Sequence, residues 1–391
     1  MNTNKLYCLL AALCCLTFLS AQTNDSLRNF PAQASLVYPL GTNGVQSKNF
    51  SYNFSLNILT GKVGGLNGME VSGLFGVVNN NAVGFQVAGL GNIVGDEMLG
   101  MQTAGIVNIV GDYAKGFQVS GLGNIVGDEM LGMQTAGIVN IVGDYANGFQ
   151  VAGLGNIVGD EMLGMQTAGI VNIVGDCAKG LQVGGLANVV GSEMKGVQIA
   201  GIYNRAKTLK GLQIGILSIN DTIESGGSLS LVNIVKKGAH KEWELSFADY
   251  NNAALSFKMG TTQLYTIYTV GVNFLEDNLW VFGIGFGNRT PIGKRLDFQP
   301  ELISYNYFPM DFKNVQHTFA THLKFGFVYN INEKFGLTLA PNIYVLNIEK
   351  GNNSDSEFYK TSSFGSFYTN NSNNRQVKIG AGISVGLSMK Y

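Results

Sequence analysis

A short glycine-rich unit that recurs every 16 residues constrains the fold of this chain more than any other feature. The unit that begins at Gly84 returns at every sixteenth residue up to Gly196, and a further copy follows at Gly211 after 15 residues. A complete copy reads G-x-Q-x-x-G-x-x-N, then two apolar residues and a turn. A degenerate first copy at Gly68 lacks the asparagine. Repetition at a fixed period is typical of architectures in which each unit stacks on the next or pairs with it.

Polar and apolar residues alternate within each copy, as they do in a β-strand. Gln86 and Asn92 share one face of the predicted strand, and Phe85, Val87 and Ile93 share the other. Because 16 is an even number, the register is kept and each Gln can lie beside the Gln of the next copy. A helix is excluded because Gly recurs within the segment and no stripe of period 3.6 is present. The sequence therefore predicts an all-β protein.

Charged residues are confined to the turns that close the copies. Between Gly84 and Lys195, every Asp, Glu, Lys or Arg falls in the last four residues of a copy. Two turn types alternate, one with Asp96-Glu97-Met98 and the other with Asp112-Tyr113-Ala114-Lys115. Antiparallel hairpins would place alternate turns at opposite ends. A recent duplication of a two-copy segment would leave the same alternation, so both explanations stay open.

Composition excludes several classes of protein. The chain is 46% hydrophobic, yet beyond its N-terminus it has no run of 18 apolar residues, which excludes a helical membrane protein. A formal net charge of -1 gives no reason to expect a nucleic-acid partner. Three of the four cysteines lie before residue 21, so Cys177 would be alone in the exported chain. An internal disulfide and a thiolate metal cluster are then excluded.

The N-terminus has the pattern of a secretory signal peptide. Met1–Lys5 is short and basic, Leu6–Ser20 is apolar, and a small residue precedes the expected cleavage near Ala21-Gln22. The rival interpretation is a membrane anchor, but the apolar stretch is short and polar residues follow at once. The predicted organisation is a signal peptide (1–21), a flexible segment (22–50), the 16-residue β-repeat region (51–235) and aromatic antiparallel strands (236–391).

After Gly211 the repeat gives way, without a linker, to longer strands in which aromatic and apolar residues alternate with other residues. Eight such strands are expected after residue 240, and the last of them ends the chain on an aromatic residue. This strand resembles the closing strand of bacterial outer-membrane barrels, whose aromatic end the assembly machinery reads. The resemblance implies an assembly signal formed by Val385, Leu387, Met389 and Tyr391.

Two folds satisfy these patterns. Strands of about 11 residues, tilted by about 40°, would span roughly 27 Å, close to the apolar band of an outer-membrane barrel. We therefore predict a single antiparallel up-and-down outer-membrane β-barrel of about 20 strands. The alternative is a β-solenoid, with one coil per copy, followed by a small β-barrel. The missing linker and the alternating turns favour the single barrel, whereas the glycine-rich apolar face and the tight, equal turns favour the solenoid.

Loop lengths predict which side of the membrane each turn faces, because long loops of such barrels face outward and short turns face the periplasm. The long polar segment Asn347–Arg375 should be extracellular, and Asn288–Arg295 and Lys236–Lys241 should be periplasmic. The same strand count puts the Asp-Glu-Met turns outside and the Asp-Tyr-Ala-Lys turns inside.

The copies resemble a group of exported surface-repeat proteins of Gram-negative bacteria, which carry tandem G-x-Q-x-x-G-x-x-N units. Gly116–Asn124, Gly196–Asn204 and the exit from the repeats at Val235–His240 match well, and the resemblance spans roughly Ser51–Phe274. It implies a location in the outer membrane or at the cell surface. It implies no activity, because no chemistry is established for the group.

Each fold predicts a different function. In the single barrel, the Gln and Asn side chains would line a lumen for weakly selective passage of small polar solutes, with residues 30–49 as a plug. In the alternative, the protein is a surface adhesin or a structural stalk held by a small barrel. The predicted lumen-lining residues are Gln86, Asn92, Gln102, Asn108, Gln118, Asn124, Gln134, Asn140, Gln150, Asn156, Gln166, Asn172, Gln182, Asn188, Gln198 and Asn204.

No set of nucleophile, base and acid can be assembled from the sequence, so we expect no enzymatic activity. His240, His317 and His322 lie in separate segments, and neither a metal nor a cofactor is expected. Asp96-Glu97 and its copies are expected to be solvated turns rather than a weak calcium site. The expected partners are the lipid of the outer membrane and the outer-membrane assembly machinery, with no nucleic acid.

Overall fold

The computed structural model describes residues 27–273, 279–310, 318–349, 366–372 and 375–391. Its regular structure is almost entirely β, with one short 3-10 helix, η1 (Gly44–Asn49), so the predicted all-β class is confirmed. The chain divides into two compact units that meet between Gly211 and Leu212. No helix among the described residues is both long and apolar enough to cross a membrane.

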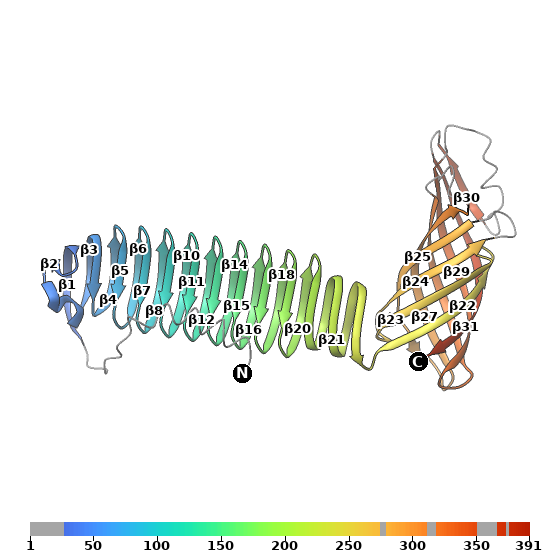
Figure 1. Ribbon diagram of the computed structural model, residues 1–391, viewed down its shortest axis with the longest axis horizontal. Helices are drawn as coiled ribbons and strands as arrows, with labels where there is room; N and C mark the ends of the chain where they lie inside the picture. Colours follow the sequence, from blue (N-terminus) through green and yellow to red (C-terminus); the bar gives the residue numbers. More distant parts are fainter. Residues whose placement is uncertain (1–26, 274–278, 311–317, 350–365, 373–374) are drawn as a thin grey trace. The chain divides into compact units, whose positions relative to one another are not determined.

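The first unit is a β-solenoid in which each 16-residue copy makes one coil (Figure 1). In one coil, β8 (Glu97–Ala104) carries the Gln and β9 (Val107–Val110) carries the Asn. Both strands pair in parallel with their equivalents in the next coil, β10 (Tyr113–Ser120) and β11 (Gly123–Val126), at a register shift of 16 residues. Two parallel sheets therefore run along the rod, one of long strands and one of short strands.

The other strands of the solenoid follow the same plan. The long-strand sheet also contains β4 (Gly65–Ser72), β6 (Ala82–Ala88), β12 (Glu129–Ala136), β14 (Tyr145–Ala152), β16 (Glu161–Ala168), β18 (Cys177–Gly184) and β20 (Glu193–Ala200). The short-strand sheet also contains β5 (Phe75–Val78), β7 (Gly91–Val94), β13 (Val139–Val142), β15 (Gly155–Val158), β17 (Val171–Val174) and β19 (Ala187–Val190). The long strand β21 (Tyr203–Lys237) begins in this unit and continues into the second.

The single barrel of about 20 strands is therefore wrong, and the solenoid alternative is the observed arrangement. The reason is a two-residue turn inside each copy. Gln86, Asn92 and Val94 are buried as the alternation predicts, but Leu90 is only half-buried because Gly89-Leu90 forms this turn. Each copy thus bends back on itself into two short strands instead of forming one long strand.

The two turn types lie at the same edge of the solenoid, so their predicted placement on opposite sides of a membrane is wrong. The backbone N–H of Asp112 donates to the carbonyl oxygen of Asp96 at 3.0 Å, and that of Asp128 donates to Asp112 at 3.0 Å. Successive turns, which are of the two types in alternation, are therefore stacked directly on one another. Hairpin geometry does not explain their alternation.

Close contact between coils explains why glycine recurs at the start of each copy. Gly148 has a φ of 136°, and a Cβ added there would lie 1.9 Å from the carbonyl oxygen of Gly132. An L-residue at this position would be strained and would clash with the neighbouring coil. Gly155 differs, because sister copies carry Val139 and Val171 at the same position and an added Cβ would meet no atom closer than 3.2 Å.

The N-terminal residues cover the first coil. Residues 22–50 were expected to be flexible, but β1 (Arg28–Val37) pairs in parallel with β3 (Phe50–Val63), and β2 (Leu40–Gly41) pairs with β1. The predicted plug segment, residues 30–49, therefore belongs to the solenoid end. The predicted signal peptide (1–21) and its three cysteines lie outside the described residues.

The second unit contains the last part of β21 and a closed antiparallel barrel of eight strands, as the solenoid alternative predicted. Closure comes from the pairing of the first barrel strand with the last. The barrel strands are β22 (His240–Ala248), β23 (Ala253–Gly260), β24 (Tyr265–Asn273), β25 (Leu279–Gly287), β27 (Leu296–Pro309), β28 (Thr318–Asn330), β29 (Phe335–Glu349) and β31 (Arg375–Lys390). The short strands β26 (Thr290–Pro291) and β30 (Ser366–Asn371) pair with β27 and β31.

The order of the strands determines which turns lie at each end of the barrel. β22 begins and β31 ends at one end, which also carries the turns at 261–264, 288–295 and 331–334. At the opposite end, β29 ends at Glu349 and β31 begins at Arg375. Most of the segment predicted to be extracellular lies outside the described residues, but the strands that flank it end and begin at the barrel end opposite the segments predicted to be periplasmic.

Candidate functional site

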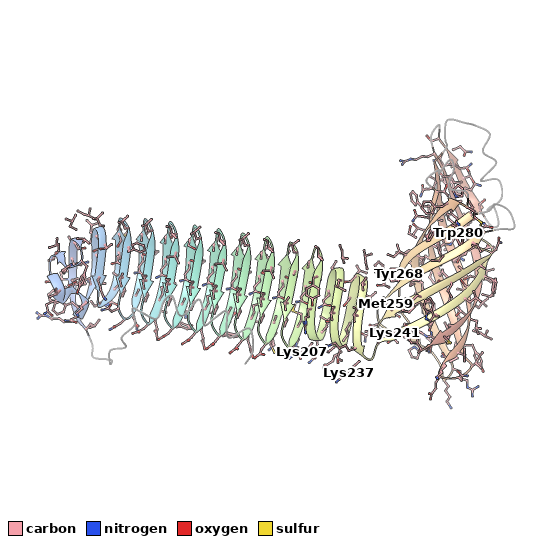
Figure 2. All side chains as sticks on the ribbon, viewed as in Figure 1. Lys207, Lys237, Lys241, Met259, Tyr268 and Trp280 are labelled. Carbon is pink, nitrogen blue, oxygen red and sulfur yellow. The ribbon has the colours of Figure 1, made fainter. Side chains whose placement is uncertain are left out.

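The structure places all sixteen predicted lumen-lining side chains inside the solenoid, where each is at most 1% exposed. Their predicted role, to line a lumen, depended on the single large barrel. In the solenoid they are instead packed inside the coils. They form two ladders along the rod, one of Gln and one of Asn. Side chains of successive coils stand in rows along the rod (Figure 2).

The Gln ladder has a fixed direction. Each Gln donates a hydrogen bond from Nε2 to Oε1 of the Gln in the preceding coil, for example from Gln134 to Gln118 at 2.8 Å. The same 2.8 Å bond recurs at every step from Gln102 to Gln198. Amides linked in this way polarise one another, so the ladder stabilises the coil stack cooperatively.

The Asn ladder runs in the opposite direction. Asn124 donates from Nδ2 to Oδ1 of Asn140 in the following coil at 2.9 Å, and also to the carbonyl oxygen of Thr135 at 2.9 Å. Each Asn from Asn92 to Asn188 repeats this pattern. The amide dipoles of the two ladders therefore oppose each other.

A buried carboxyl group ends the Gln ladder. Glu70, in the degenerate first copy, stands where later copies carry Gln, and its side chain is fully buried. Gln86 donates to its Oε2 at 2.9 Å, while Asn57 and Ser55 donate to its Oε1 at 3.0 and 3.2 Å. Burial raises the pKa of the Glu70 carboxyl, and these hydrogen bonds offset the increase only in part.

This carboxyl group should make solenoid stability depend on pH. Because the pKa of Glu70 in the folded chain lies above its ordinary value of 4.5, the folded chain binds the proton more tightly than the unfolded chain. The free energy of unfolding of the first coils should therefore fall as pH rises from 4.5 through the raised pKa. Glu70→Gln should reduce this fall, because an amide does not titrate, and should leave the part that comes from the raised pKa values of Asp96 and Asp128. Urea unfolding at a series of pH values measures it.

The control for this prediction is Glu161→Gln, which changes an exposed carboxyl group at the start of β16. This variant should keep the fall in stability shown by the unchanged protein. An equal pH dependence in the Glu70→Gln variant and in the unchanged protein would contradict the assignment to Glu70.

One edge of the solenoid is acidic. We define the acidic edge as the stacked turn residues Asp96, Asp112, Asp128, Asp144, Asp160 and Asp176. Burial raises the pKa of Asp96, and the nearby carboxylates of Asp112 and Glu97 raise it further. Asp128 shows the same direction for the same kinds of cause. In the described part of the chain, no group of three or more His, Cys, Asp or Glu side chains is arranged to hold a metal ion.

The opposite edge is apolar. We define the aliphatic edge as Leu90, Ile106, Leu122, Ile138, Leu154, Ile170, Leu186 and Ile202, one residue per coil. All are exposed except Leu90, which is half-buried. The backbone groups of this edge are paired along the rod, as in the hydrogen bond from Leu122 N to Ile106 O at 2.9 Å. Sequence reasoning missed this edge because it placed Leu90 within a continuous strand, on the same face as Gln86 and Asn92.

The barrel has an apolar exterior. Along β22, Trp243, Leu245 and Phe247 are exposed, whereas Glu242 and Glu244 between them are buried. We define the outer belt as the exposed apolar residues Trp243, Leu245, Phe247, Leu255, Val270, Phe282, Leu302, Leu323, Phe327, Leu337, Leu339, Ile343, Val385 and Leu387. The predicted assembly-signal residues Val385, Leu387, Met389 and Tyr391 are all exposed, and their role in assembly stays a prediction.

A network of charged side chains fills one end of the barrel interior. Lys258 Nζ lies 2.6 Å from Glu301 Oε1, 2.7 Å from Glu244 Oε2 and 3.6 Å from Glu242 Oε1. Lys324 lies 3.5 Å from Glu301 and 3.7 Å from Glu244. Each carboxylate between the two lysines is shared, so the charges compensate one another away from water.

Arg289 extends this network toward the barrel end at which β22 begins and β31 ends. It forms ion pairs with Glu242 and, at 2.8 Å, with Asp297. The other end of the interior is aromatic, because the ring of His322 packs against those of Tyr250, Tyr305 and Tyr344. His240 lies instead beside Tyr265 and Glu242, so the two described histidines occupy separate surroundings.

Sequence reasoning did not identify the charged network, although β22 carried a signal for it. Its charged residues alternate with aromatic and aliphatic ones, so a barrel with an apolar exterior must turn Glu242 and Glu244 inward. Chemically, the network is a set of compensated ion pairs that packs the interior. A search of known protein families finds no model that matches this chain, and searches of curated proteins and of solved structures find no similar protein.

Proposed function

We propose that this protein is a structural stalk of the outer membrane, in which the eight-stranded barrel is the anchor and the solenoid is the part that the anchor holds. The observation that carries the proposal is the inverted polarity of the barrel. Glu242, Lys258 and Glu301 are buried inside it, while the outer belt is apolar and exposed. An exposed apolar surface of this extent is typical of a barrel in lipid and costly for a barrel in water.

The size and filling of the barrel favour an anchor over a pore. Eight strands leave an interior just wide enough for side chains. The Lys258 network and the rings around His322 occupy that interior. The passive passage of polar solutes, which required the large barrel, therefore has less support than the stalk.

Strand order supports a side of the membrane for the solenoid. β21 ends at Lys237, and only Gly238 and Ala239 separate it from β22. β22 begins at the barrel end that carries the short turns, which in outer-membrane barrels faces the periplasm. β29 ends and β31 begins at the opposite end, which then faces outward. On this basis the solenoid is a periplasmic stalk rather than a cell-surface adhesin.

Labelling of single cysteines with a membrane-impermeant maleimide tests this proposal. In a Cys177→Ser background, Phe367→Cys places a thiol on exposed β30 and Asp144→Cys places one on the acidic edge. Phe367→Cys should be labelled on intact cells. Asp144→Cys should be labelled only after the outer membrane is permeabilised. Labelling of Asp144→Cys on intact cells would favour the surface adhesin, and recovery of the protein in the soluble fraction would contradict the anchor.

A further inference from the structure

We infer that the aliphatic edge of the solenoid is a lipid-binding surface, which enters the apolar layer of a phospholipid leaflet. The inference builds on the proposed function and names the partner of the stalk. Each coil contributes one Leu or Ile to this edge, and Leu122, Leu154 and Leu186 are each 48% exposed. With coils about 4.8 Å apart, eight such residues form a row about 34 Å long.

The solenoid has its acidic residues at one edge and its aliphatic residues at the other. The carboxylates of the acidic edge lie after the short strand, and the aliphatic edge lies after the long strand, across the coil from them. Between the two edges, the outward residues of the long strands include the exposed Phe117 and Phe149 at mid-strand, and Val119 nearer the aliphatic edge. The rod is therefore amphipathic along its length, which is the property of elements that lie at a membrane interface.

The unit that contains the barrel also has exposed apolar side chains on β21. In β21, Ile216, Leu231 and Val232 are exposed. Thr266 of β24 donates a hydrogen bond from Oγ1 to the carbonyl oxygen of Ser230 at 2.7 Å, so this part of β21 is fixed against the barrel. Thr266 lies at the short-turn end, next to the turn at 261–264. Leu231 and Val232, which follow Ser230, are thus held near the short-turn end of the barrel.

The chemistry of the edge favours lipid over a second copy of the chain. Pairing of β-strands between copies needs unpaired backbone groups, but those of the edge are used along the rod, as in Ile138 N to Leu122 O at 2.9 Å. The row repeats only Leu and Ile, so it offers neither hydrogen-bonding groups nor an anchor residue of distinct shape. A row of aliphatic side chains is instead suited to contact with the acyl chains of lipids.

Quenching by brominated lipids tests this inference on the full chain in liposomes. In the Cys177→Ser background, an environment-sensitive fluorophore is attached to Leu122→Cys on the aliphatic edge, Asp128→Cys on the acidic edge or Leu323→Cys on the outer belt. Lipids brominated on their acyl chains should remove roughly half or more of the emission at the first and third positions, as expected for apolar surface within lipid. Emission from Asp128→Cys should be unchanged.

The three positions separate the possible failures. Quenching at Leu323→Cys without quenching at Leu122→Cys would overturn the lipid-binding edge and leave the anchor intact. No quenching at Leu323→Cys would overturn the proposed function itself. Disulfide-linked dimers of the unlabelled Leu122→Cys variant, together with no quenching of the labelled one, would assign the edge to a second copy of the chain. Leu154→Cys, one double unit further along, repeats the measurement if the first variant does not fold.

Discussion

Replacing Gln134 with Met should lower the stability of the central solenoid coils by about 2–6 kcal/mol, because it leaves two buried polar groups without partners at about 1–3 kcal/mol each. Gln118 Oε1 loses the hydrogen bond that it accepts from Gln134, and Gln150 Nε2 loses its acceptor. Met has nearly the same shape, so the loss of hydrogen bonds rather than a cavity accounts for the effect. Amide hydrogen exchange of residues 113–158, followed by mass spectrometry, measures the free energy of local opening.

The matched control is Met133→Ala in the same strand. Met133 points outward and is exposed, so its truncation should change stability by no more than about 0.5 kcal/mol. Equal protection in the Gln134→Met variant and the unchanged protein would show that the ladder does not hold the coils together. The loss should also be local, because each coil contacts only its neighbours.

Replacing Lys258 with Met should destabilise the barrel by about 3–5 kcal/mol, the usual cost of removing one partner from a buried ion pair. Glu244 and Glu301 would each lose their closest cation, at 2.7 and 2.6 Å. Glu242 would lose its contact with Lys258 at 3.6 Å. Lys324 and Arg289 remain, but Lys324 is at least 3.5 Å from these carboxylates. Urea unfolding of the barrel in lipid or detergent, followed by the fluorescence of Trp243 and Trp280, measures the change.

Lys334→Met is the control, because Lys334 lies exposed in the turn between β28 and β29. It should leave barrel stability almost unchanged. Adding Glu301→Gln to Lys258→Met should recover part of the loss, since one uncompensated charge is removed. If Lys258→Met unfolds at the same urea concentration as the unchanged protein, water must reach the network and screen it.

The sequence alone predicted which residues of the solenoid are internal, but not how the strands are connected. Alternation placed Gln86 and Asn92 on one face, and the even period kept successive copies in register. An antiparallel hairpin and a parallel coil both satisfy these two conditions. The deciding feature is the turn at Gly89-Leu90, which looks like part of a strand because Leu is common in strands. Only the positions of neighbouring coils show that the chain reverses there.

Within the barrel, strand positions followed from alternation, whereas the ion pairs depended on register. Glu242 lies directly opposite Lys258 in the pairing of β22 with β23, and Glu301 lies opposite Lys324 in the pairing of β27 with β28. Such partners are far apart in the sequence, so one chain without its register does not identify them. The contact of Lys258 with Glu301 crosses the interior and required the closed barrel.

Because the parallel stacking keeps a constant shift of 16 residues, the length of the solenoid changes in steps of whole repeats. A 32-residue double unit inserted between two coils would add about 9.6 Å to the rod. It would meet the same hydrogen bonds on both sides, so neither Glu70 at one end nor the barrel at the other would be disturbed. Recombination between near-identical copies therefore changes the length of the solenoid without changing its fold.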